Sequence, residues 1–246
     1  MKKILIIGAT SAIAAAFARI SAAEKAAFFL VARDADKLQQ TADDLRTRGA
    51  AAVDTHTLDM NAFAFHQAML DAAFAALGQV DIVLIAHGTL PDQKACEADV
   101  ELALREFSSN GLSVIAVLTL LANRMQAQGH GAVAVISSVA GDRGRPSNYL
   151  YGTAKAAVTT FCEGLRARMF KCGVHVLTIK PGFVDTPMTK GLPLPGLLVA
   201  TAERVAKDIH CAIRKKKNSI YTPWFWWGIM SIIRSVPTAI FKRTNL

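Results

Sequence analysis

The chain has 246 residues, of which 52% are hydrophobic and 19% are charged. This composition excludes disordered, collagen-like and low-complexity chains, and the length suits a single α/β domain. The four cysteines form no C-x-x-C pair and share no metal-ligand spacing with the six histidines, so neither a disulfide framework nor a metal site is expected. The net charge is +9, and +8 of it lies in residues 204–246, where nine Lys or Arg residues accompany one acid.

The amino terminus does not have the pattern of a signal peptide. Its apolar run, residues 4–7, is too short for an h-region and ends at Gly8. No stretch reaches the roughly 18–20 continuous apolar residues that cross a bilayer. We therefore expect a cytoplasmic protein.

Short apolar runs and helical patterns alternate along the chain. The expected strands are residues 4–7, 28–31, 53–58, 82–85, 132–136 and 174–179, and the expected helices are residues 12–23, 37–48, 63–77, 108–128 and 151–171. Nearly continuous apolar strands that alternate with helices are typical of a parallel sheet covered on both faces. The sequence predicts one doubly wound, Rossmann-type α/β domain over residues 1–222, followed by an aromatic and basic helical appendage at 223–246.

The turn after the first strand, residues 8–14, is a candidate phosphate site. Gly8 permits a sharp turn, and the amino terminus of the next helix offers unpaired N–H groups to a pyrophosphate; an ordinary capped turn is the alternative. At the end of the second strand, Ala32 stands where a site for NAD carries an acid, and the adjacent Arg33 favours NADP(H) over NAD(H). Asp59, just after the third strand, is expected either to meet the adenine edge or to cap the next turn.

The most informative residues are Ser138, Tyr151 and Lys155. Tyr151 and Lys155 are four positions apart and share one face of a helix. An ammonium group beside a phenol should lower the phenol pKa, as proton exchange near neutral pH requires. Ser138, at the end of the preceding strand, can donate a hydrogen bond to a carbonyl oxygen on which negative charge develops.

On these motifs the chain resembles the short-chain dehydrogenase/reductase family over about residues 4–190. The resemblance implies that Tyr151 exchanges a proton with the substrate oxygen, that Lys155 lowers the pKa of Tyr151 and holds the nicotinamide ribose, that Ser138 polarises the carbonyl, and that Asn110 keeps a water molecule in a proton relay. The cofactor-binding residues expected from the turn, the strand ends and the resemblance are Gly8, Thr10, Ser11, Ala12, Ile13, Arg33, Asp59, Met60, Ala86, His87, Gly88, Tyr151, Lys155, Pro181, Gly182, Val184 and Thr186.

The sequence departs from the family pattern in the glycine turn and after the fourth strand. Ile7, Ala12 and Ala14 replace the usual Thr and the last two glycines, and residues 85–88 read I-A-H-G where the family has N-N-A-G. His87 is expected to be structural or adjacent to the cofactor. Because all four catalytic residues are present, we predict an oxidoreductase that transfers hydride between NADP(H) and a carbonyl or secondary alcohol. A catalytically weakened NADP(H)-binding regulator or scaffold, or an epimerase or dehydratase, remains the alternative.

Two further segments bear on the substrate and on partners. Residues 188–201, an apolar loop rich in Gly and Pro, are expected either to form a lid over a hydrophobic substrate or to pack on the core. In residues 221–246, an aromatic cluster (residues 224–227) with basic flanks favours peripheral contact with an anionic inner membrane surface, with docking on the enzyme or on a partner subunit as the alternative.

The resemblance and the composition also indicate partners. Similar tails occur in reductases of lipid-linked ketones, including a polyprenyl-phosphate-linked keto-pentose, so a small-molecule or lipid-linked carbonyl substrate is expected. No nucleic-acid-reading motif is present, so no nucleic acid partner is expected. Family members usually pair through the helices that correspond to residues 108–128 and 151–171, which implies a homodimer or homotetramer.

Overall fold

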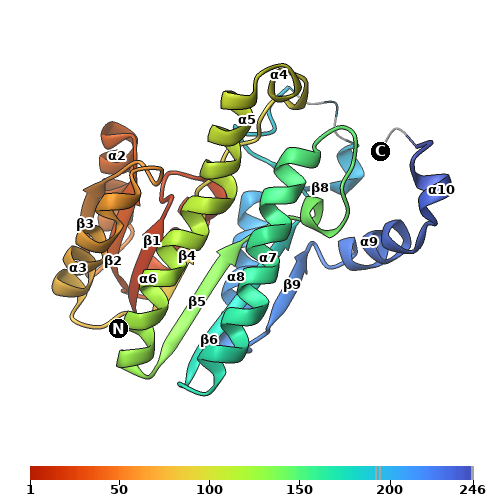
Figure 1. Cartoon of the computed structure of the whole chain (residues 1–246). Helices are drawn as coiled ribbons and strands as arrows, with labels where there is room; N and C mark the ends of the chain where they lie inside the picture. Colours follow the sequence, from red (N-terminus) through yellow and green to blue (C-terminus); the bar gives the residue numbers. More distant parts are fainter. Residues whose placement is uncertain (192, 194, 245–246) are drawn as a thin grey trace.

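The computed structural model describes residues 1–191, 193 and 195–244, and within them a parallel seven-stranded sheet forms the centre of the molecule (Figure 1). The strand order is β3-β2-β1-β4-β5-β6-β9. The strands are β1 (Lys3–Ile7), β2 (Ala27–Ala32), β3 (Ala52–Thr57), β4 (Ile82–Ile85), β5 (Gly131–Ile136), β6 (Val174–Pro181) and β9 (Ser219–Thr222). The order reverses beside β1, and in such sheets ligands bind beyond the carboxyl ends of the strands at this switch point.

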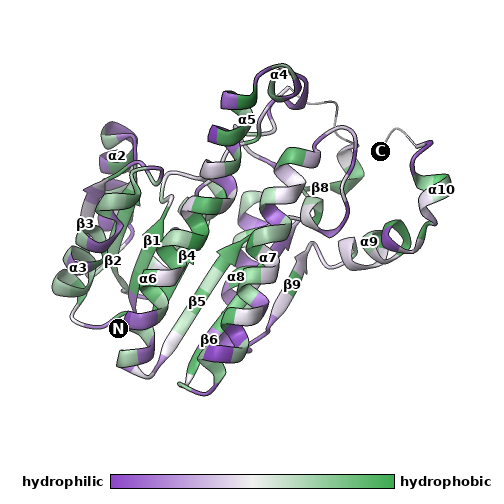
Figure 2. Cartoon of the chain, in the orientation of Figure 1, coloured by the Kyte–Doolittle hydropathy of each residue, from purple (hydrophilic) through white to green (hydrophobic). Residues whose placement is uncertain are grey.

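Helices cover both faces of the sheet, as the sequence predicts. One face packs against α1 (Ala12–Ala23), α2 (Ala35–Thr47) and α8 (Ala202–Arg214), and the other against α3 (His66–Leu77), α6 (Ser113–Gln128) and α7 (Tyr149–Phe170). Strand β1 contributes to both layers, because alternate side chains of a strand point to opposite faces. In Figure 2 the strands are largely green, whereas purple residues concentrate on the outer helices and loops. The doubly wound α/β fold is confirmed.

The long helix expected at residues 108–128 is part of a longer helical segment. It begins with α4 (Gln93–Ala98) and α5 (Val100–Phe107), passes through a single π-helical turn (Ser108–Leu112), and continues as α6. Asp92 and Asp99 cap α4 and α5 by accepting hydrogen bonds from backbone N–H groups. The sequence analysis missed these two helices, although residues 100–107 have the amphipathic pattern of a helix.

Several shorter elements complete the fold. The 3₁₀ turns are η1 (Phe63–Phe65), η3 (Val139–Asp142) and η4 (Gly196–Leu198), and β7 (Phe183–Asp185) pairs with β8 (Val199–Thr201). The β7–β8 pair brackets the expected substrate loop at 188–201. Leu192 and Leu194 of that loop lie outside the described residues.

The carboxy-terminal appendage consists of α9 (Trp226–Ser235) and α10 (Thr238–Phe241), which lie beyond β9 in Figure 1. Trp226 is 2% exposed and packs with Val139 and with Phe183, whose ring meets the indole edge-on at 5.1 Å. One face of α9 is therefore docked on the body of the protein. Among the described residues, no helix combines the length and the apolar character that crossing a membrane requires.

A single arginine joins this appendage to the loop after η3. The Arg143 guanidinium donates a hydrogen bond of 2.7 Å to the Val236 carbonyl and another to the Ile233 carbonyl, and it lies 3.8 Å from the centroid of the Phe241 ring. Arg143 thus caps the end of α9 and holds α10 through a cation–π contact.

Candidate active site

The turn between β1 and α1 has the backbone geometry of a phosphate site. Gly8 has φ +86°, and a Cβ atom there would lie 2.4 Å from the His87 nitrogen, so only glycine fits. Ser11 caps α1 by accepting a hydrogen bond from Ala14 N–H at 3.2 Å. The first N–H groups of α1 therefore face the crevice at the switch point, where the helix dipole favours an anion.

Residues after β2 and β3 form the next part of the same wall. Arg33 is exposed and lines the cavity, and its neighbour Asp34 caps α2 by accepting from Lys37 N–H at 3.0 Å. Asp59 accepts a hydrogen bond from Asn61 N–H at 2.9 Å and also lines the cavity. Asp59 thus caps the next turn, and contact with the adenine edge stays a prediction.

His87 after β4 is held as a neutral structural group. The Ser113 hydroxyl donates to the Ser109 carbonyl at 2.9 Å, so His87 Nε2–H is the donor in its 2.9 Å contact with Ser113 Oγ. Burial, with a smaller contribution from the Lys155 charge, lowers the pKa of His87 to about 3. A neutral imidazole fixed in this way suits a cavity wall better than proton exchange.

Asn110 is placed by the π-helical turn between α5 and α6. Its side chain is buried; Nδ2 donates to Thr89 Oγ1 at 2.8 Å and to the Glu106 carbonyl at 3.0 Å, while Oδ1 accepts from Thr89 N–H at 2.9 Å. A Cβ atom on Gly88 would lie 2.8 Å from Asn110 Oδ1 and 3.6 Å from Lys155 Nζ. Gly88 is therefore the point at which Asn110 and Lys155 approach each other. Single π turns of this kind are frequent at functional sites.

Ser138 and Tyr151 are brought together by two close backbone approaches between η3 and α7. A Cβ atom on Gly141 would lie 2.7 Å from Ala156 N, and one on Gly152 would lie 2.8 Å from the Ala140 carbonyl oxygen. A larger residue at either position would separate the two segments. The contact leaves the side chains of Ser138 and Tyr151 on the wall of one cavity.

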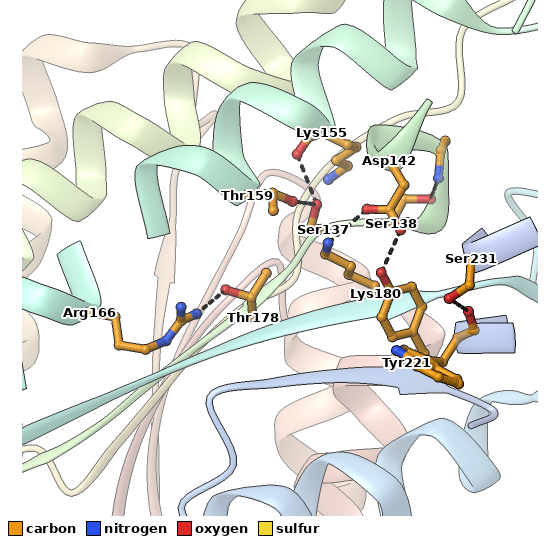
Figure 3. A network of polar contacts seen from close by, with 12 residues as sticks. Ser137, Ser138, Asp142, Lys155, Thr159, Arg166, Thr178, Lys180, Tyr221 and Ser231 are labelled. Carbon is orange, nitrogen blue, oxygen red and sulfur yellow. Dashed lines mark hydrogen bonds and ion pairs between the residues drawn. The ribbon is translucent and has the colours of Figure 1, made fainter. Parts of the chain in front are cut away.

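The end of β5 is also tied to α7 by side-chain hydrogen bonds (Figure 3). The Ser137 hydroxyl donates to the Lys155 carbonyl at 3.0 Å and lies 2.7 Å from the Thr159 hydroxyl. Lys155 Nζ in turn donates to the Ile136 carbonyl at 3.2 Å. Ser138 and Lys155 are therefore fixed relative to each other by the same junction.

We expected Lys155 to lower the pKa of Tyr151, and this expectation is wrong: in this structure the pKa of Tyr151 is raised. Burial raises the pKa of Tyr151 to about 12, and the hydrogen bond with Ser138 offsets only part of this rise. Burial also lowers the pKa of Lys155 to about 8. The ammonium lies 5.6 Å from the centroid of the Tyr151 ring, and desolvation disfavours the charged form of each group. At neutral pH the phenol is therefore protonated, the form that can donate a proton.

A buried ion pair joins the end of η3, the turn that follows Ser138, to strand β6 (Figure 3). Lys180 Nζ on β6 lies 2.7 Å from Asp142 Oδ1, and the Tyr221 hydroxyl on β9 donates to Asp142 Oδ2 at 2.6 Å. Burial and the hydrogen bond to this carboxylate raise the pKa of Tyr221. Because η3 runs from Val139 to Asp142, this network anchors the end of the turn that starts directly after Ser138.

The predicted site residues face one cavity of about 520 Å³. Every residue predicted to be catalytic or to bind the cofactor lines it, from Gly8 after β1 to Thr186 after β7. The cavity is also lined by Met188, at the start of the expected substrate loop, and by Thr89, Arg145 and Asn148, which the sequence analysis did not single out. Arg145 and Asn148 precede Tyr151 by six and three positions, and this proximity to the motif is the signal that could have identified them.

A glycine turn at the switch point, together with adjoining Ser, Tyr and Lys side chains in one cavity, defines a Rossmann-type nicotinamide-dependent oxidoreductase. Comparison with known proteins agrees. The family model described as short chain dehydrogenase matches residues 2–194. The chain belongs to the short-chain dehydrogenase/reductase family, and it is an oxidoreductase whose fold binds a nicotinamide cofactor.

Individual relatives extend over almost the whole chain. An uncharacterized oxidoreductase of Mycobacterium tuberculosis (strain CDC 1551 / Oshkosh) is 36% identical, over 98% of this chain and 96% of its own length. An uncharacterized oxidoreductase of Streptomyces coelicolor is 34% identical, over 98% of this chain and 95% of its own length. Among solved structures, a variant of the actinorhodin polyketide ketoreductase with NADPH has a TM-score of 0.78 and 24% identity, covering 86% of this chain and 90% of that one; the likeness concerns the fold.

Proposed function

We propose that this protein is an NADPH-dependent carbonyl reductase that acts on a hydrophobic or lipid-linked ketone. The observation that carries the proposal is the position of the protonated Tyr151 phenol, beside Ser138 and Lys155 at the wall of a cavity that also contains the phosphate turn. A phenol held in its acid form favours the reductive direction, in which a proton is given to the substrate oxygen.

The donor groups around the cavity suit a dinucleotide. The amino terminus of α1 offers N–H groups to a pyrophosphate, the exposed Arg33 adds a cation beyond β2, and the buried Lys155 supplies an ammonium group beside Tyr151. We assign the adenine and ribose side of the cofactor to the residues after β2 and β3, and the nicotinamide side to the residues after β4, β5 and β6. When bound, the reduced nicotinamide supplies the hydride.

In this mechanism the chain's own residues position the substrate and deliver the proton. Ser138 donates a hydrogen bond to the carbonyl oxygen, where it stabilises developing negative charge. Tyr151 then gives its proton to that oxygen. Lys155, whose ammonium lies 5.6 Å from the centroid of the Tyr151 ring, then returns a proton to the phenolate and regains its own from solvent, and Asn110 keeps a water molecule in this relay. The buried His87 stays neutral throughout.

The experiment that tests this function is reduction of apolar ketones by the purified protein. With NADPH and either 2-decanone or methyl 3-oxodecanoate, loss of absorbance at the nicotinamide band together with formation of the alcohol is the expected result. NADPH binding without turnover of any ketone would favour the scaffold alternative. Conversion of the ketone with no net change in absorbance would favour an epimerase or dehydratase.

Cofactor preference gives a separate prediction. Replacing Arg33 by Ala should raise the KM for NADPH by roughly 10-fold or more, since a charge-assisted hydrogen bond to a phosphate contributes about 1.5–3 kcal/mol, while the KM for NADH changes little. Steady-state kinetics with both cofactors measure the effect. Arg214→Ala, on the outer surface of α8, is the matched control. NADPH differs from NADH by a 2′-phosphate. If Arg33→Ala raised the KM for NADPH and the KM for NADH equally, Arg33 would not bind this phosphate.

We further propose that the protein is cytoplasmic and that residues 221–246 make peripheral contact with the inner membrane surface. Trp226 faces inward, whereas Trp224 and Trp227 are 74% and 64% exposed, and the same tail carries the basic residues Arg234 and Lys242. Exposed indoles beside cations fit the interface of an anionic bilayer.

The membrane proposal predicts binding to anionic vesicles. The protein should co-sediment with vesicles that contain phosphatidylglycerol and not with pure phosphatidylcholine, and the double variant Trp224→Ala/Trp227→Ala should lose most of this binding. Phe170→Ala, at an 83% exposed site on α7, is the matched control because it removes an exposed ring without adjoining the appendage. If the double variant still co-sedimented with the anionic vesicles, Trp224 and Trp227 would not be the residues that bind the membrane.

The organisation of the chain is part of the same proposal. Residues 1–222, with the substrate loop at 188–201, form the catalytic domain, and residues 223–246 form the membrane-facing tail. The helices at residues 108–128 and 151–171 pair with those of a second copy in a homodimer or homotetramer. An exposed apolar side chain on the first of them, Leu112, supports this pairing.

A further inference from the structure

A short loop between η3 and α7 adds two polar side chains to the substrate side of the cavity. Arg145 and Asn148 line the same cavity as Ser138, Tyr151 and Met188. The loop starts at the carboxyl end of β5 and leads directly into the helix that carries Tyr151 (Figure 1). Neither side chain has a part in the proton transfer or in cofactor binding as derived above.

The Arg145 side chain is partly buried without a protein partner for its charge. Its Nε atom is buried and has no hydrogen-bond acceptor in the described part of the chain, and no carboxylate there lies within ion-pair distance of it. Burial lowers the pKa of this guanidinium, although the charge of Asp142 acts in the opposite direction. Asp142 is itself engaged by Lys180 and Tyr221.

Two neighbouring residues on the same loop show which side chains are paired and which are not. Arg143, two positions earlier, donates to backbone carbonyls of α9 and lies over an aromatic ring. Asn148, three positions later, has a buried Oδ1 atom that also lacks a partner among the residues described. A buried donor atom and a buried acceptor atom left unpaired cost free energy, so their retention beside a cavity indicates a ligand.

The charge around the cavity defines the chemistry of that ligand. Within the described residues the acidic side chain that lines the cavity is Asp59, which follows β3 on the far side of β1 from β5. The substrate end therefore has a cation without a counter-ion. A guanidinium presents a planar fork of donors that matches the oxygens of a carboxylate or a phosphate.

We propose that Arg145, assisted by Asn148, binds an anionic oxygen group of the substrate, so that the substrate class is an apolar carbonyl compound that carries a carboxylate or a phosphate. This inference rests on the proposed reductase function. Arg145 fixes the charged end of the molecule, and the apolar part occupies the remaining cavity towards Met188. Anchoring one end in this way holds the carbonyl near Ser138 and Tyr151.

Binding to the NADPH-loaded protein tests the anion site without relying on turnover. Decanoate and decyl phosphate should each bind measurably in titration calorimetry, and decanol, the neutral probe, should bind more weakly. Arg145→Ala should weaken binding of the preferred anion by roughly 10- to 100-fold, as expected for a charge-assisted pair, with little effect on decanol. Whichever of decanoate and decyl phosphate binds more tightly shows whether the site prefers a carboxylate or a phosphate on its substrate. Arg145→Lys should retain part of the affinity, and Arg214→Ala should retain all of it.

Kinetics then connect the site to the reaction. Arg145→Ala should reduce kcat/KM for 3-oxodecanoate roughly 10-fold or more while changing that for methyl 3-oxodecanoate far less. Failure of the wild type to bind either anion, or equal losses for acid and ester, would overturn the anion site. A weaker NADPH affinity in Arg145→Ala, measured by calorimetry, would also overturn it by making Arg145 a cofactor ligand. If neither ketone is reduced but the anion binding depends on Arg145, the reductase proposal fails and the binding site stands.

Discussion

Replacing Tyr151 by Phe is expected to lower kcat for ketone reduction by about 10²- to 10⁴-fold, the usual contribution of a positioned general acid. The ring remains, so its position beside Lys155 is preserved, and only the hydroxyl group with its proton is lost. NADPH affinity should stay close to that of the wild type. Single-turnover reduction of methyl 3-oxodecanoate and calorimetric titration with NADPH measure the two quantities.

Tyr149 provides the matched control for this substitution. It lies two positions earlier on α7, is 45% exposed, and does not line the cavity. Tyr149→Phe removes the same hydroxyl from the same helix and should leave kcat unchanged. If Tyr151→Phe reduced ketones at nearly the wild-type rate, Tyr151 would not be the proton donor.

The pH dependence of kcat in the wild type also tests the roles of Tyr151 and Lys155 in proton transfer. Reduction needs a protonated phenol, and a Tyr151 pKa raised to about 12 keeps it protonated over the whole accessible range. The Lys155 pKa, lowered to about 8, predicts that the first alkaline loss of kcat comes from deprotonation of Lys155. A rate that is constant between about pH 6 and 7 and declines through pH 8 is therefore expected, with no separate decline near pH 10.

The sequence predicted those parts of the fold and site that depend on local patterns. Continuous apolar runs located β1, β2, β4, β5 and β6, because a strand buried on both faces leaves no room for polar residues. The spacing of Tyr151 and Lys155 placed them on one face of a helix, and Ser138 fell at the end of a strand. These are properties of a few consecutive residues.

Other features could not be predicted because they depend on tertiary contacts. The pKa of Tyr151 is set by burial among distant segments, which the spacing to Lys155 does not reveal. The close approaches at Gly141 and Gly152, and the position of Arg145 on the cavity wall, exist only after η3 has packed on α7. The tail offered two interpretations, and the fold shows that Trp226 docks on the protein while the neighbouring indoles do not.

Replacing Asp142 by Asn is expected to lower the free energy of unfolding by about 3–5 kcal/mol, because it leaves the Lys180 ammonium buried without its counter-ion. The two side chains are only 3% and 10% exposed, so solvent cannot replace the lost interaction. The midpoint of urea denaturation, at an unchanged slope, measures the loss.

Two further variants identify the charge as the cause. Tyr221→Phe removes the hydrogen bond to Asp142 and leaves the ion pair, so it should destabilise less than Asp142→Asn. The double variant Asp142→Leu/Lys180→Met removes both charges and should recover most of the lost stability, since a buried pair contributes little relative to apolar residues of similar size. A double variant as unstable as Asp142→Asn would show that the packing of η3, and not the unpaired ammonium, limits stability. The stable double variant should still reduce ketones more slowly than the wild type, because η3 then lacks the polar anchor that holds the segment after Ser138 against β6 and β9.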